Sequence, residues 1–120
     1  MKQPKRVIIV DDQPAVLTGL KAILAFYPEI LVVGEAGNGW DAVQLVAAQQ
    51  PDVVVMDLQM PVMDGIEATR LIKRQWPAIK VIVLTVQAAR RGEAFVAGAD
   101  HFLLKGNGPE TLQQAILIDT

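Results

Sequence analysis

Five short apolar runs, rich in β-branched residues, recur along the chain. They predict β-strands at 6–10, 30–36, 52–56, 80–85 and 101–104. Most of these runs lack the alternation of apolar and polar residues that marks a strand with one face in water. Strands that are apolar on both faces are typical of parallel sheets covered by helices on both sides. The pattern therefore predicts a buried parallel sheet.

Apolar residues at helical spacing occupy the segments between the predicted strands. They predict helices at 14–26, 39–49, 65–76 and 109–118, and a weaker one near 87–97. Pro14 and Pro109 suit the first turn of a helix, because proline has no backbone N–H to lose there. In the weak segment, Gly92 interrupts the helical pattern and Gly98 ends it. We expect that helix to be short or loosely packed.

The order of the predicted elements gives the fold class. Five strand–helix units form a three-layer α/β/α sandwich, because parallel crossovers are right-handed and cover both faces of the sheet. We expect one domain over residues 1–120, α/β in class, with a five-stranded parallel sheet in the flavodoxin-like order 2-1-3-4-5. The composition fits such a domain, with 52% apolar and 20% charged residues.

Charge and composition exclude several classes of protein. The net charge is −2, from 11 basic and 13 acidic residues, which does not support a large nucleic-acid surface. The sequence has no cysteine, and therefore no disulfide framework or thiol nucleophile. No apolar run approaches the roughly 20 residues of a membrane span, and "MKQPKR" lacks the apolar core of a signal peptide. We expect a cytoplasmic protein that does not enter the membrane.

Polar residues follow four of the five predicted strands. Asp11 and Asp12 follow the first strand, Asp57 the third and Lys105 the fifth, and Thr85 ends the fourth. A single acid in such a place is ordinarily a cap or turn residue. In open parallel sheets, however, ligands bind beyond the carboxyl ends of the strands. Five side chains converging on one edge therefore indicate a functional site.

Three carboxylates at one edge need compensation, because each pair about 4 Å apart costs about 4 kcal/mol at an effective dielectric near 20. Lys105 can neutralise one charge. A divalent cation such as Mg²⁺ suits the hard carboxylate oxygens and keeps positions free for a phosphate. Phosphoryl transfer is stabilised mainly by placed cations and donors, and a carboxylate can be the acceptor. Asp57, central in the sheet, is the best candidate for that acceptor.

Four segments carry a resemblance to a known family: "VDDQP" at 10–14, "MDLQMPVMDGIEATRLIK" at 56–73, "VIVLT" at 81–85 and "AGADHFLLK" at 97–105. The chain resembles, over essentially its whole length, a response-regulator receiver domain of bacterial two-component signalling. The wording of "DGIEATR" and "AGAD…LLK" is most similar to receivers of the NarL/LuxR type. Such receivers usually precede a helix-turn-helix domain that binds DNA.

The resemblance implies a role for each residue of the cluster. Asp57 accepts a phosphoryl group from a phosphohistidine of a sensor histidine kinase. Mg²⁺, with Mn²⁺ as an alternative, is held by Asp12, Asp57 and the backbone carbonyl of Gln59, with Asp11 acting directly or through water. Lys105 contacts the phosphate oxygens. The protein is then a phosphoacceptor that assists its own phosphorylation and dephosphorylation rather than a dedicated enzyme.

The resemblance also implies a conformational switch. Thr85 turns its hydroxyl toward the phosphate, and Phe102 moves inward with it. The shift between two states is read on the face formed by the fourth helix, fifth strand and fifth helix. A plain core role explains Phe102 equally well. We interpret Asp64 as a helix N-cap and His101 as structural.

Four further apolar residues lie on the predicted helices or at their ends. Trp40 and Trp76 are expected to pack helices against their neighbours. Val16 and Leu17 suit either a kinase-docking surface or the core.

Particular residues argue against three rival functions. A hydrolase of the haloacid dehalogenase type would need a second acid two residues after the nucleophile, where Gln59 stands. A flavin-binding electron carrier would need a phosphate loop after the first strand, where Asp11 and Asp12 would repel phosphate. A receiver-like scaffold that is not phosphorylated is disfavoured because all five key side chains are present.

The resemblance also concerns the domain that such a receiver controls. No output domain follows within residues 1–120, which end at "ILIDT". The chain is either a stand-alone receiver or part of a longer transcription regulator, and the NarL/LuxR likeness favours the second. DNA would be contacted only through a helix-turn-helix domain that these residues lack. Homodimerisation on phosphorylation is a further expectation.

Overall fold

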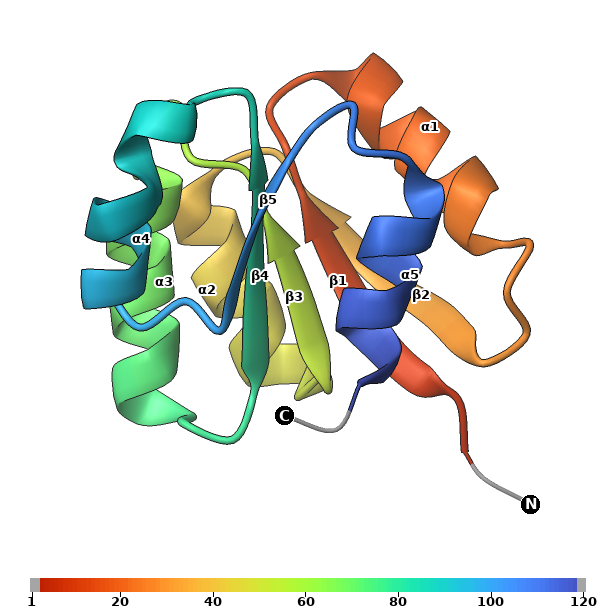
Figure 1. The fold of residues 1–120 in the computed structure, drawn as a ribbon. Helices are drawn as coiled ribbons and strands as arrows, with labels where there is room; N and C mark the ends of the chain where they lie inside the picture. Colours follow the sequence, from red (N-terminus) through yellow and green to blue (C-terminus); the bar gives the residue numbers. More distant parts are fainter. Residues whose placement is uncertain (1–2, 119–120) are drawn as a thin grey trace.

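A parallel sheet of five strands forms the middle layer of the computed structural model, which describes residues 3–118 (Figure 1). The strands are β1 (Lys5–Val10), β2 (Ile30–Ala36), β3 (Val53–Met56), β4 (Lys80–Thr85) and β5 (His101–Leu104). Their order is β2-β1-β3-β4-β5, and every neighbouring pair is parallel. The predicted fold class and strand order are confirmed. The predicted strand bounds differ from these by one residue at most.

The helices are α1 (Pro14–Leu24), α2 (Gly39–Gln49), α3 (Gly65–Gln75), α4 (Arg91–Val96) and α5 (Pro109–Leu117). The segment predicted as a weak helix near 87–97 divides into a 3-10 turn, Ala88–Arg90, and the six-residue α4. Ala94 is the buried residue of α4, so little apolar burial supports a longer helix there. Within residues 3–118, no helix combines the length and apolarity needed to cross a membrane.

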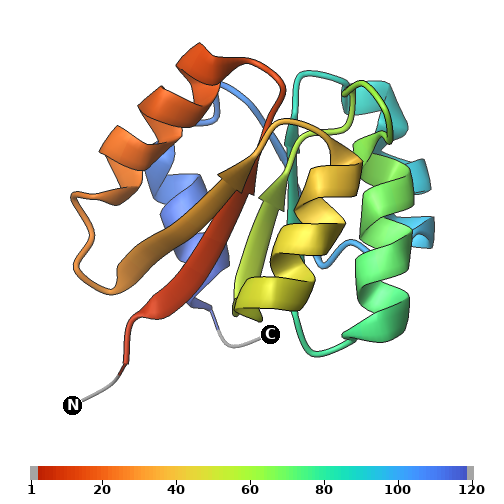
Figure 2. The ribbon, with the colours of Figure 1, turned by 180° about the vertical axis from the view of Figure 1, so that it is seen from behind.

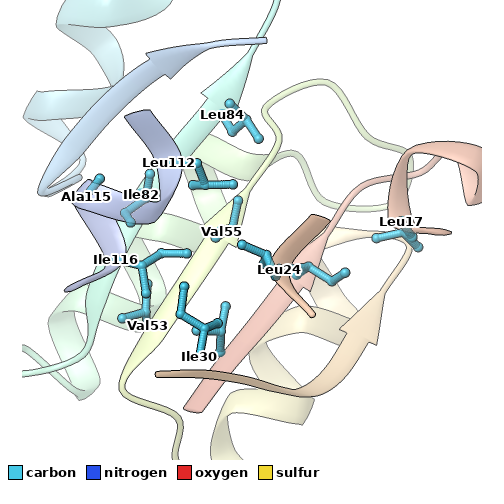
Figure 3. Packing of buried hydrophobic residues seen from close by; sticks show 12 residues of the cluster. Leu17, Leu24, Ile30, Val53, Val55, Ile82, Leu84, Leu112, Ala115 and Ile116 are labelled. Carbon is cyan, nitrogen blue, oxygen red and sulfur yellow. The ribbon is translucent and has the colours of Figure 1, made fainter. Parts of the chain in front are cut away.

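One face of the sheet is covered by α1 and α5 (Figure 1). Leu17 and Leu24 of α1 and Leu112 and Ile116 of α5 meet strand residues in an apolar cluster, seen close by in Figure 3. Complete burial of one such side chain contributes about 1.5–3 kcal/mol to the stability of the folded chain. The buried position of Leu17 favours its core role over a docking role.

The opposite face is covered by α2, α3 and α4, as the view from behind shows (Figure 2). Neighbouring strand residues point to opposite faces, so this side has its own apolar clusters. Trp76 packs against the cluster under α2 and α3, as predicted. Trp40, predicted to pack as well, is 52% exposed. Ala42 and Val46 are the residues of α2 that fill the interface, and Trp40 lies off their side of the helix.

The loop between β3 and α3 is in close contact with two glycines, Gly65 and Gly39, that have no room for a Cβ. A Cβ at Gly65 would lie 1.9 Å from the carbonyl oxygen of Asp57, and one at Gly39 would lie 2.4 Å from that of Met63. The same glycines donate backbone hydrogen bonds across these contacts, Gly65 to the carbonyl of Leu58 and Gly39 to that of Met63, each at 2.8 Å. The loop that follows Asp57 is therefore fixed to the first turns of α2 and α3.

Two side-chain caps fix where these helices begin. The Asp64 carboxylate accepts a hydrogen bond from the backbone N–H of Glu67 at 3.0 Å, which confirms the predicted N-cap of α3. Asn38 accepts in the same way from Asp41 at 2.8 Å at the start of α2. Both caps satisfy backbone donors that a helix start leaves without partners.

A buried lysine joins β4 to the end of α5. Lys80 is 8% exposed, and its Nζ donates to the carbonyl of Ala115 in the last turn of that helix and to that of Ile118 just after it. Carbonyl oxygens at a helix C-terminus lack intrahelical partners and carry a partial negative charge. The ammonium therefore satisfies them, and they replace the water that Lys80 has lost.

Thr69 gives a test of the core under α3. Its side chain is 0% exposed, and its Oγ1 has no hydrogen-bond partner among residues 3–118. We expect Thr69→Val to raise the free energy of unfolding by about 1 kcal/mol, because the substitution keeps the shape and removes an unpaired buried hydroxyl. Urea denaturation monitored by circular dichroism measures the change.

Thr111 is the matched control. It also lies in a helix, but its hydroxyl donates to the carbonyl of Asn107 at 3.1 Å. Thr111→Val should therefore leave stability unchanged or lower it. A Thr69→Val protein less stable than the original chain would contradict the packing described here.

Candidate functional site

The carboxyl ends of β1, β3, β4 and β5 lie along one edge of the sheet, the upper edge in Figure 1. The strand register places their polar residues side by side. Val10 pairs with Met56, so Asp11 and Asp57 follow at neighbouring positions. Thr85 pairs with Leu104, the residue before Lys105. Parallel pairing thus assembles the cluster that the sequence predicts.

Lys105 lies between two of the carboxylates. Its Nζ is 2.6 Å from Oδ2 of Asp11 and 3.4 Å from Oδ2 of Asp57. Its backbone N–H donates to the carbonyl of Thr85 at 2.9 Å, which fixes the start of the side chain. A single ammonium therefore contacts two carboxylates, and its one positive charge offsets one of their negative charges.

The three acidic residues differ in their exposure to water. Asp11 is 1% exposed and uses both oxygens, one toward Lys105 and the other as acceptor from the backbone N–H of Gln13 at 2.9 Å. Asp57 is 8% exposed, and its Oδ1 accepts from the N–H of Leu58 at 2.8 Å. Asp12 faces solvent. Asp11 is thus the most tightly held of the three.

Burial raises the pKa of Asp57 above its ordinary value of 3.8, and the neighbouring Asp11 carboxylate raises it further. Lys105 and the N–H of Leu58 act in the opposite direction without cancelling the effect. Burial alone would lower the pKa of Lys105, but the hydrogen bond and charge of Asp11 and the charge of Asp57 outweigh it and raise the pKa. Lys105 therefore stays charged at neutral pH.

The same three carboxylates suit a divalent cation. One oxygen from each of Asp11, Asp12 and Asp57 lies within 4.8 Å of the others. Three carboxylates against one ammonium leave an excess of two negative charges, which matches the charge of such an ion. Hard oxygen donors of this kind favour Mg²⁺ or Mn²⁺ over softer metals. The residues present therefore fit a divalent metal site.

Two glutamines connect the loops on either side of the cluster. The side chain of Gln59 accepts a hydrogen bond from Nε2 of Gln87 at 2.6 Å. The backbone N–H of Gln87 donates to the hydroxyl of Thr85 at 3.2 Å. Thr85 is 1% exposed, and this bond holds its hydroxyl against its own loop. The sequence predicted Thr85 but not Gln87, since no pattern marks a hydrogen bond between two loops.

Phe102 lies on β5, away from the carboxylates. It packs against the apolar cluster under α4, and its ring centroid is 6.4 Å from that of Phe95. The guanidinium of Arg91 lies over both rings, 5.0 Å from the centroid of Phe95 and 6.0 Å from that of Phe102. The inward movement of Phe102 stays a prediction. No pattern in the sequence indicates that the guanidinium of Arg91 lies over the ring of Phe102.

Comparison with known proteins finds relatives along most of the chain. A family model described as the response regulator receiver domain matches residues 7–117. The transcriptional regulatory protein LnrK of Bacillus subtilis is 38% identical over 114 residues, which are 93% of this chain and 52% of that protein. The nitrate/nitrite response regulator NarL of Escherichia coli is 33% identical over 117 residues, which are 96% of this chain and 54% of that protein. The chain spans about half the length of these relatives.

Solved structures agree with the fold. A two-component response regulator of the LuxR family from Aurantimonas superposes with a TM-score of 0.89 at 37% identity, covering 95% of this chain and 83% of that one. The isolated receiver domain of RcsB from Salmonella enterica, solved with the phosphomimetic BeF₃⁻, gives a TM-score of 0.84 at 30% identity, covering 93% of this chain and 85% of that one.

The raised pKa of Asp57 makes stability depend on pH. The unfolded chain ionises near 3.8 and the folded chain only at higher pH, so folding loses stability as pH rises through that interval and does not regain it at neutral pH. We expect Asp57→Asn to be more stable than the original chain at pH 7, on the order of 1 kcal/mol. The difference should shrink as pH falls through the same interval toward 3.8 and should be absent below it.

Asp12→Asn is the control, because it removes a charge from the same cluster at an exposed position. Its effect on stability at pH 7 should be smaller than that of Asp57→Asn. Thermal melting of the three proteins between pH 3.5 and 7 decides the point. A gain that does not vary with pH would contradict burial as its cause.

Proposed function

The chain belongs to the response regulator receiver family, and from this premise we propose that Asp57 accepts a phosphoryl group. The observation that carries the proposal is the place of Asp57. It is buried at the end of the central strand, and its Oδ2 lies 3.4 Å from an ammonium that Asp11 also holds. Burial that raises the pKa of Asp57, together with two further carboxylates beside it, is typical of a functional site at a strand end.

The proposed transfer is a single displacement at phosphorus. A carboxylate oxygen of Asp57 forms a bond to phosphorus, and the bond from phosphorus to the imidazole nitrogen of a phosphohistidine breaks. The leaving nitrogen keeps the electron pair, and the product is an acyl phosphate. Lys105 already faces the oxygen that changes, and its flexible stem allows its charge to follow the phosphoryl oxygens.

Asp11, Asp12, Asp57 and the backbone carbonyl of Gln59 are the proposed ligands of Mg²⁺, with Mn²⁺ as an alternative. The ion, when bound, offsets the negative charge of the carboxylates and of the incoming phosphoryl group. The burial of Asp11 and the exposure of Asp12 suit different tasks. Asp11 is held in place by Lys105 and Gln13, while Asp12 is free to adjust toward a ligand.

Two residues are proposed to report the change. Thr85 turns its hydroxyl toward the phosphoryl group, and Phe102 follows on β5. Such a shift between two states would alter the face formed by α4, β5 and α5. Val96, 89% exposed on α4, would move with that face.

The wider role is proposed from the relatives that the chain matches over half their length. A sensor histidine kinase is the proposed phosphodonor, and homodimerisation on phosphorylation is a proposed consequence. Control of transcription would act through a helix-turn-helix domain outside residues 1–120, in the cytoplasm. The relatives named as transcriptional and nitrate/nitrite regulators support this role. A dedicated hydrolase is disfavoured because Gln59 stands where that chemistry needs an acid.

Acetyl phosphate with Mg²⁺ should add one phosphoryl group to the chain, observed as a single increase in intact mass. The group should be lost in mild base, as an acyl phosphate is. Asp57→Asn should abolish the labelling, since an amide oxygen does not replace the carboxylate nucleophile.

Asp41→Asn serves as the control for this labelling. It makes the same chemical change at an exposed acid on α2 that is not one of the three clustered carboxylates, and it should be labelled like the original protein. Unchanged labelling of the Asp57→Asn protein would sink the assignment.

The metal site predicts a second effect. Adding Mg²⁺ should raise the melting temperature of the original chain, by about 3–5 °C for each 1 kcal/mol of binding. Asp12→Asn should weaken that response, because it removes a ligand without removing a buried group. Differential scanning fluorimetry over a Mg²⁺ titration measures both. Equal responses from the two proteins would exclude Asp12 as a ligand.

A further inference from the structure

We propose that Arg90 is a positioning residue that restrains phosphorylation, because it holds the loop after β4, and through it the hydroxyl of Thr85, in the resting arrangement. The inference rests on the proposed phosphorylation of Asp57. Arg90 closes the 3-10 turn before α4 and does not touch the acidic cluster. It acts through Gln87, which connects it to both sides of the site.

Arg90 binds three elements at once. Its Nε and one guanidinium nitrogen donate to Glu93 of α4 at 2.9 and 3.1 Å. The other guanidinium nitrogen donates to Oε1 of Gln87 at 3.3 Å. The side chain also reaches the cap of α3, with Asp64 at 3.5 Å. Only an arginine offers enough donors in a fixed plane to bind all three.

Gln87 in turn is held at three points. Its Oε1 accepts from Arg90, its Nε2 donates to Gln59, and its backbone N–H donates to the hydroxyl of Thr85. Gln59 belongs to the loop that follows Asp57, which the tight glycine contacts hold in place. The movable loop is therefore tied to the fixed one on the far side of the cluster.

Apolar packing adds little to this restraint. Val86 is 74% exposed, and Ala94 is the residue of α4 that is buried. Segments with few buried apolar contacts open most easily, so the polar contacts of Gln87 and Arg90, beside the stacking of Arg91 on two rings, decide where this loop rests. Arg90 itself keeps about a quarter of its side-chain surface exposed, so its contacts are partly screened by water.

These contacts oppose the step that the proposed function requires. Thr85 must turn its hydroxyl toward the phosphoryl group, which breaks its bond from the N–H of Gln87. Every contact that holds Gln87 adds to the free energy of that movement. Release of Arg90 should therefore increase the population of the competent arrangement. A partly exposed ion pair allows an effect of about two- to fivefold.

Arg90→Gln tests the inference, with Arg74→Gln as the matched control. Arg74 is an exposed arginine in the last turn of α3. Two measurements are made on each protein. Hydrogen–deuterium exchange without phosphodonor reports the opening of residues 86–96, and intact mass over time reports phosphorylation by acetyl phosphate with Mg²⁺.

Arg90→Gln should exchange faster at 86–96 while the sheet exchanges as before, and should be phosphorylated about two- to fivefold faster than the original chain. Arg74→Gln should match the original chain in both. Arg90→Lys, which keeps the charge and loses the planar fork, should fall between. A residue that only supports the fold would lower the melting temperature and slow the reaction.

Phosphorylation of Arg90→Gln at the original rate or more slowly would overturn the inference, as would unchanged exchange at 86–96. Both results leave the proposed function standing, since the original chain is still labelled. An original chain that gains no phosphoryl group would overturn the proposed function itself.

Discussion

The ammonium of Lys105 makes the acidic edge of this sheet possible. Two carboxylates at the ends of β1 and β3 are buried, and removing each from water costs several kcal/mol unless a charge or donor replaces that water. Lys105 lies 2.6 Å from one and 3.4 Å from the other, which ties the last strand of the chain to the first and the third. The excess negative charge that remains is what makes these residues fit a divalent cation.

Much of this arrangement follows from local sequence signals. Unbroken apolar runs located the strands to within a residue, and the parallel order then placed Asp11, Asp57, Thr85 and Lys105 at one edge. Asp64 as a helix cap and the shortness of α4 were also predictable, because caps and helix breakers act on their immediate neighbours. Backbone topology converts these local signals into a site without any further information.

The remainder depends on contacts between side chains distant in sequence. Asp11 is buried and its neighbour Asp12 is exposed. The run "DD" does not indicate which of the two side chains points inward. Gln59 and Gln87 meet across 28 positions, and Arg91 covers two aromatic rings on different elements. Trp40 was expected inside and is half exposed, because helical spacing does not say how much of a wide apolar stripe the neighbours cover.

Positions around the site differ in how well they should tolerate substitution, because Gly65 and Gly39 have no space beside them. At Gly65 and Gly39 themselves, any added carbon would meet backbone that has nowhere to move, so these two positions should accept few substitutions. By contrast, the loop from 86 to 91 is held by exposed or half-exposed side chains and should accept many. Related chains can therefore differ in their rate of phosphorylation while keeping the same chemistry, because different loops determine the two properties.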